Sequence, residues 1–172
     1  MNRLKSYLVW LRRIGHCRGF GIQSPADYWF VRYVINEHWP YYRYAELGRN
    51  DDWLTCKLGR LYFRLANWRQ PTTVMSDGYQ EYFKAGCGKT EFGRSTELIR
   101  LTLDDDYCER LKTICSKANE QMVLIVEGLW KDKNFWREIT SDERTSVTFD
   151  LYYCGIVLFD KKRTKKNYII NF

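Results

Sequence analysis

The stretch Met122–Gly128 reads MVLIVEG and decides the fold of this 172-residue chain. Its run of consecutive apolar residues is typical of a strand that is covered on both faces, as strands of a parallel sheet are. Other segments with strand-like patterns lie on either side of it in the sequence. They are TTVMS (72–76) and ELIRLTLDDD (97–106) upstream, and TSVTFDLYY (145–153), GIVLFDKK (155–162) and NYIINF (167–172) downstream.

Apolar residues at helical spacing predict helices before and between these strands. Ser24 is the expected N-cap of a helix that begins with Pro25. The clearest pattern after the second strand spans 107–118, and the three aspartates before it suit the positive end of a helix. The other predicted helices cover residues 4–14, residues 50–70 and the surroundings of Phe135–Ile139.

This order of elements predicts one compact domain of the α/β class. Residues 1–70 form a helical N-terminal extension that packs on an α/β core of residues 71–172. Hydrophobic residues make up 45% of the chain, yet no apolar run approaches the roughly 20 residues of a membrane-spanning helix. The apolar part of the start is too short for a signal peptide, so we expect a cytoplasmic protein without a membrane partner.

Cysteines and histidines give no sign of a metal site. The six cysteines are scattered without paired spacing, and the chain has only two histidines, His16 and His38. A zinc site normally needs such ligands at close, regular spacing. We therefore predict no metal ligands, and the sequence contains no recognisable catalytic base or nucleophile triad.

The stretch KAGCGKTEFGRST (84–96) contains Gly-Lys-Thr, the end of a phosphate-binding loop. A complete loop needs a glycine five residues before Gly88, but Phe83 stands there. The nearest predicted strand ends too far upstream, and the following residues are poor helix formers. We expect a flexible glycine-bearing connection instead of a nucleotide site.

The net charge is +7, and basic residues cluster in KKRTKK, between two strand patterns. A solvated turn explains this cluster, and an anionic partner such as nucleic acid or an acidic protein is the alternative. The residues concerned are Lys161, Lys162, Arg163, Lys165 and Lys166.

Three longer segments carry a resemblance to a known family. RGFGIQSPADYWFVRYVINEHWPYYRY (18–44) resembles the N-terminal signature of a group of bacterial class I S-adenosylmethionine (SAM)-dependent methyltransferases, which open with His-Gly-x-Gly-Ile-His-Ser-Pro-Phe. GRLYFRLANWRQPTTV (59–74) and the C-terminal segment 145–172 are similar to the same group. The resemblance implies a Rossmann-like sheet, usually ordered 3-2-1-4-5-7-6, with an added helical N-terminal segment.

The resemblance also implies which residues would contact SAM if binding were retained: Asp77, Gly78, Asp104 and Glu127. In these enzymes the first strand ends in an acid and a glycine-rich turn. Here Ser76 stands at the position of the acid, Asp77 lies one residue further on, and Gly78 is the one glycine kept. A plain turn after the strand and a helix cap at Asp104 are the structural alternatives.

The length of chain between two predicted strands limits the sheet. Between Val74 and Leu124 there are 49 residues. A full path from the family's strand 1 to its strand 5 needs roughly 63 residues, whereas two crossovers and one strand need about 29. We therefore expect strands 2 and 3 to be missing. This leaves about five strands in the order 1-4-5-7-6, mostly parallel with an antiparallel C-terminal edge.

Three functions remain open on this basis. The first is a methyltransferase-like protein, a pseudoenzyme that has lost SAM binding and catalysis and acts through binding or assembly. The second is an active minimal methyltransferase that contacts SAM through Asp77, Gly78 and Asp104, with Glu127 near the substrate. The third is a basic interaction module, for which binding should weaken with salt.

The missing strands would leave the first strand at an exposed edge of the sheet. Proteins tend to cover or pair such an edge. We therefore expect that residues 79–97 fold over it or that two chains form a homodimer there.

Overall fold

The computed structural model describes residues 3–103 and 106–172 of the chain. The chain divides into two units. The first contains residues 1–70, 79–90 and 170–172, and the second contains residues 71–78 and 91–169.

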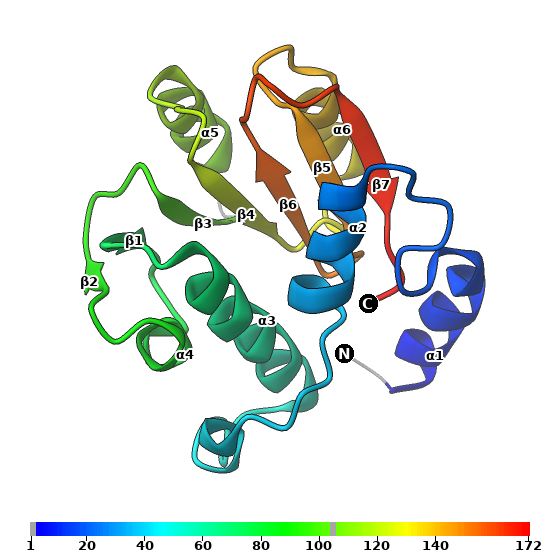
Figure 1. Cartoon of the computed structure of the whole chain (residues 1–172), viewed down its shortest axis with the longest axis vertical. Coiled ribbons are helices and arrows are strands. Elements are labelled where there is room, and N and C mark those ends of the chain that lie inside the picture. The colour runs from blue at the N-terminus through cyan, green and yellow to red at the C-terminus, as the bar shows by residue number, and fades with distance from the viewer. Residues whose placement is uncertain (1–2, 104–105) are drawn as a thin grey trace. The chain divides into compact units, whose positions relative to one another are not determined.

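The second unit contains a sheet of seven strands within the described residues, in the order β2-β1-β3-β4-β6-β5-β7 (Figure 1). All neighbouring strands are parallel except that β6 runs antiparallel to both β4 and β5. The strands are β1 (Thr73–Met75), β2 (Glu91–Phe92), β3 (Leu98–Thr102), β4 (Val123–Glu127), β5 (Val147–Asp150), β6 (Cys154–Leu158) and β7 (Lys166–Ile169).

The prediction of an α/β chain with a mostly parallel sheet is confirmed. The five strands that were expected as neighbours lie side by side as β1-β3-β4-β6-β5. The expected total of about five is wrong, because β2 and β7 extend the sheet at its two ends. The expected antiparallel edge is also wrong: the antiparallel strand is internal, and the edge strand β7 is parallel to β5.

The strand β2 corrects a further expectation. It lies on the outer side of β1 and is reached from β1 through a helix, as a second strand would be. The count of residues excluded a strand of ordinary length, but a two-residue strand fits. The amide of Glu91 donates to the carbonyl of Thr72 at 2.8 Å, and the amide of Gly93 donates to that of Val74 at 3.1 Å.

Because of this pairing, β1 is not an exposed edge. Residues within 79–97 pair with it, as the first of the two expectations had it. The alternative expectation, a homodimer through β1, assumed a bare edge at β1, and β2 occupies that edge.

Two helices of the second unit pack against one face of its sheet, α5 (Tyr107–Ser116) and α6 (Lys133–Ser141). Ile99 and Leu101 of β3 contribute to this core, and so do the alternate residues Leu124 and Val126 of β4. The helix predicted over 107–118 is confirmed as α5: Ile114 and Cys115 are buried, and Tyr107 and Leu111 pack against the same core, as does Ala118 just after the helix ends.

The first unit is helical within its described residues. Ser24 caps α2 as predicted: its Oγ accepts the amide of Asp27 at 3.3 Å. The longest helix begins after Asp52, whose side chain accepts the amide of Thr55 at 2.7 Å, and it ends where Gln70 takes a left-handed conformation. The elements are α1 (Arg3–Arg12), η1 (Ile14–His16), α2 (Pro25–Phe30), η2 (Val31–Ile35), η3 (Tyr42–Ala45), α3 (Trp53–Arg69) and α4 (Gln80–Gly86).

The stretch 84–96 runs from the end of α4 to β2, so its order is helix, turn and strand. A phosphate-binding loop needs the opposite order, from strand to helix. Lys84 donates from Nζ to the carbonyl of Thr90 at 2.7 Å, and a Cβ on Gly86 would overlap the carbonyl of Phe63 on α3. In this unit the glycine therefore serves close packing of two helices.

Candidate functional site

The carboxyl ends of β1 and β4 bring three of the four predicted cofactor residues together. Asp77 and Gly78 lie in the turn after β1, and Glu127 is the last residue of β4. The crevice outside the carboxyl ends of parallel strands is where open α/β sheets bind ligands. The fourth predicted residue, Asp104, lies outside the described residues.

A residue that the sequence analysis did not single out, Arg100 in the middle of β3, joins these groups. Its Nη1 donates to Oδ1 of Asp77 at 2.8 Å, and its Nε donates to Oε2 of Glu127 at 2.8 Å. The side chain of Arg100 is 7% exposed, whereas those of Glu127 and Asp77 are 18% and 56% exposed. One buried guanidinium therefore forms ion pairs with both carboxylates.

The register of the sheet explains this meeting. Arg100 pairs with Ile125 and Thr102 pairs with Glu127, so Arg100 and Glu127 are diagonal neighbours on adjacent strands. Successive residues of a strand point to opposite faces. Ile99 and Leu101 face α5 and α6, so Arg100 points to the other face, as does Glu127. A signal for this pair was present in the sequence: a single arginine interrupts the apolar pattern LIRLTL.

The turn after β1 is closed by its own hydrogen bonds. The hydroxyl of Ser76 donates to the carbonyl of Gly78 at 2.6 Å and accepts the amide of Gly78 at 3.4 Å. Tyr79, the next residue, has a left-handed backbone with φ of 60°, which is uncommon for a residue other than glycine. The serine at the position of the family's acid therefore stabilises the turn itself.

Arg100 also lies close to the turn after β1. A Cβ placed on Gly78 would lie 3.6 Å from Nη1 of Arg100, so a guanidinium occupies the space beside the one glycine that the turn keeps. Both nearby carboxylates already accept hydrogen bonds from it. A ligand that approaches this turn would therefore have to displace Arg100 from one or both of these contacts.

The basic segment 161–166 connects β6 to β7. Lys161 and Lys162 are exposed, and Arg163 lies with Nε at 3.4 Å from a carboxylate oxygen of Asp160. Lys165 donates from Nζ to the carbonyl of Asp142 at 2.5 Å, while Lys166 is the first residue of β7. Part of this positive charge therefore stabilises the turn, and an anionic partner stays a prediction.

Two further classes of site were searched among the described residues. No group of three or more histidine, cysteine or acidic side chains is placed to hold a metal ion there. Nor does any helix in that part of the chain combine the length and the apolar character needed to cross a bilayer.

The chain was compared with known protein families, with curated proteins and with solved structures. None of the three comparisons finds a significant match.

Proposed function

We propose that this chain is a methyltransferase-like α/β protein that no longer binds SAM and acts through binding or assembly. The observation that carries the proposal is the pair of ion contacts made by Arg100. They place a buried positive charge beside Gly78 and engage both Asp77 and Glu127. These are the groups through which the resembled enzymes would hold the cofactor.

The arrangement of strands supports the methyltransferase-like part of the proposal. The order β2-β1-β3-β4-β6-β5 corresponds to the resembled order with one outer strand removed, and β7 is an additional strand beyond β5. The strand at the second position has two residues, both exposed. A Rossmann-like crevice binds its ligand between the strand ends on both sides of the switch point. A strand of two residues supplies little of the crevice wall on its side.

Isothermal titration calorimetry of the full chain with SAM and with S-adenosylhomocysteine tests the proposal. We expect no binding heat for either compound. Gly78→Arg is the matched control variant, because any heat from contacts elsewhere would persist in it. A micromolar affinity that Gly78→Arg abolishes would contradict the proposal.

An active minimal methyltransferase is the second candidate, because Asp77, Gly78 and Glu127 do meet at one end of the sheet. It requires Arg100 to release both carboxylates. A methylation assay with tritiated SAM on a cell extract distinguishes the two candidates. Incorporation above background that is lost in Gly78→Arg would favour the enzyme, and its absence favours the proposal above.

A further inference from the structure

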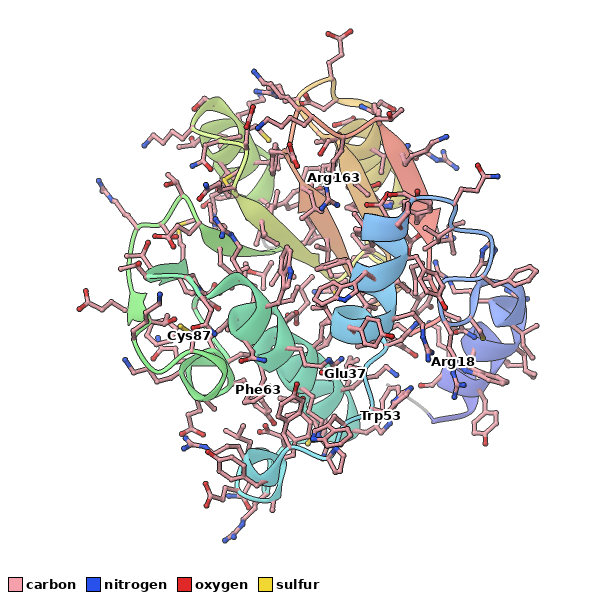
Figure 2. The ribbon with its side chains drawn as sticks, in the orientation of Figure 1. Arg18, Glu37, Trp53, Phe63, Cys87 and Arg163 are labelled. Atoms are coloured by element: carbon pink, nitrogen blue, oxygen red, sulfur yellow. The ribbon has the colours of Figure 1, made fainter. Side chains whose placement is uncertain are left out.

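A pocket of about 780 Å³ lies entirely within the first unit. Trp53, Lys57, Arg60 and Arg64 line it from α3, where spacings of four, three and four residues place them on one side of the helix. The other lining residues come from 35–45, at the end of η2 and in η3, together with Cys56 and Phe172. Figure 2 labels Glu37 and Trp53, one from each of the two main lining segments.

The charges that line the pocket are mostly positive. Lys57, Arg60 and Arg64 contribute cations, and Glu37 is the one acid among the described lining residues. The carboxylate of Glu37 is already engaged, since it accepts the hydroxyl of Tyr41 at 2.8 Å. A pocket with this balance attracts anions.

Arg64 is the deepest of these cations, and the residue is 7% exposed. Its Nε donates to the carbonyl of Val34 at 2.6 Å and its Nη2 to that of Ile35 at 2.8 Å, while Nη1 lies 3.4 Å from the hydroxyl of Tyr44. Among the described residues, no carboxylate forms an ion pair with it. The hydrogen-bond acceptors around this buried guanidinium are thus neutral carbonyl and hydroxyl groups. Buried charges are normally paired with an opposite charge.

Asn36 supplies a second unmatched group. It is 8% exposed and lines the pocket, and its Nδ2 is buried without a hydrogen-bond acceptor within the described part of the chain. A buried donor that lacks an acceptor is costly. Because this nitrogen has almost no accessible surface, a ligand oxygen would remove that cost only once the Asn36 side chain turns toward the pocket.

Aromatic rings complete the lining. Trp39 is 68% exposed and Tyr42 is 80% exposed. Nζ of Lys57 lies 4.5 Å from the ring centre of Phe172 and 5.2 Å from that of Trp53. Exposed rings beside cations form a surface on which a flat ring can stack next to a phosphate.

We infer that this pocket binds a nucleoside phosphate, whose base stacks on the exposed rings, whose phosphate faces Arg60 and Lys57, and one of whose oxygens accepts from Asn36. The base and the phosphate should both contribute to the affinity, because the exposed rings and the cations line the same pocket. The inference goes beyond the proposed function, and it does not depend on the sheet of the second unit.

Titration of ADP into the full chain at low salt, followed by tryptophan fluorescence and calorimetry, tests the inference. We expect ADP to bind at least about 10-fold more tightly than adenosine or inorganic pyrophosphate, because each of these lacks one half of the ligand. A short single-stranded oligonucleotide tests the source of the ligand: tighter binding than ADP would identify a nucleic-acid strand, and weaker binding a free nucleotide. Failure of both ADP and the oligonucleotide to bind would overturn the inference.

Three variants assign the binding to the pocket. Arg60→Gln and Asn36→Leu should each weaken ADP binding about 10-fold or more, and Asn36→Leu should do so without loss of folding stability, because it removes an unpaired donor. Arg137→Gln removes an exposed cation of α6 in the other unit and should leave ADP binding unchanged. Equal affinity in all three variants would contradict the assignment. Gly78→Arg should also bind ADP normally, so a failure here is distinct from a failure of the proposed function.

Discussion

Replacement of Arg100 by methionine is the most direct perturbation of the site at the ends of β1 and β4. Methionine keeps most of the volume of the side chain and removes its charge. Arg100 is 7% exposed at its side chain, and Glu127 is 18% exposed, so their ion pair is largely buried. Breaking a buried pair from one side costs about 3–5 kcal/mol. Because Glu127 keeps some access to water, we expect Arg100→Met to lower the free energy of unfolding by about 3 kcal/mol, the lower end of that range.

The contact with Asp77 should contribute much less. The side chain of Asp77 is 56% exposed, and exposed ion pairs contribute about 0–1 kcal/mol. Asp77→Asn should therefore cost less than about 1 kcal/mol. Arg137→Met, which changes an exposed arginine in the same way, should stay within about 0.5 kcal/mol of the unchanged protein.

A double-mutant cycle measured by urea unfolding with circular dichroism checks the reasoning. Replacing a buried ion pair by apolar residues of similar volume is often neutral, so Arg100→Met with Glu127→Met should recover most of the stability that Arg100→Met alone loses. The two changes would then be strongly coupled. A double variant that loses the sum of the two single losses would refute a buried ion pair as the determinant of this site. A loss below about 1 kcal/mol for Arg100→Met would do the same.

Three further predictions concern other parts of the chain. A Cβ on Gly155 would overlap the ring of Trp136, so Gly155→Ala should lower the free energy of unfolding by about 1–3 kcal/mol in urea titrations, and unchanged stability would contradict this packing. Burial, followed by the hydrogen bond to Glu37, raises the pKa of Tyr41 to about 12. The folded protein therefore holds the phenolic proton of Tyr41 more tightly than the unfolded chain does, and the free energy of unfolding should fall as the pH rises from about 10 toward 12. In unfolding experiments at alkaline pH, Tyr41→Phe should show a smaller fall. Burial and then the charges of nearby cations lower the pKa of His38, so its NMR titration midpoint should lie below 6.5. The midpoint should rise when ADP is bound. A midpoint at or above 6.5 in the free protein would contradict a positive pocket.

The sequence was sufficient for the parts of the fold in which local pattern and burial agree. The strand β4 and the helix α5 were predicted from their apolar patterns, because each buries the apolar residues of its pattern. The neighbour order of the five central strands followed from the resemblance. In these elements no distant contact overrides the local preference.

The sequence was insufficient where structure depends on pairing between distant segments. Glu91 and Phe92 form a strand only because β1 offers unpaired backbone groups, and nothing in two residues announces that. The ion contacts of Arg100 depend on the register of β3 against β4, which a sequence does not state. The exposure of Trp39 likewise depends on tertiary packing, because an aromatic residue in a sequence is equally consistent with the core and with the surface.

The polar side chains at the ends of β1 and β4 and those of the pocket beside α3 differ in whether they find their partners within the chain. At the end of the sheet, Arg100 donates hydrogen bonds to Asp77 and Glu127, so a ligand that binds there would have to displace contacts made inside the chain. In the helical unit, Arg64 is buried without a carboxylate partner among the described residues, and Asn36 holds a donor without an acceptor there. Buried polar groups are nearly always hydrogen-bonded, and Arg64 is so within the chain, which leaves Nδ2 of Asn36 as an open donor of this pocket among the described residues. The polar groups at the end of the sheet are thus held by one another, whereas the pocket beside α3 combines a positive lining with the open donor of Asn36. This contrast favours the pocket, and not the end of the sheet, as the place where a ligand binds.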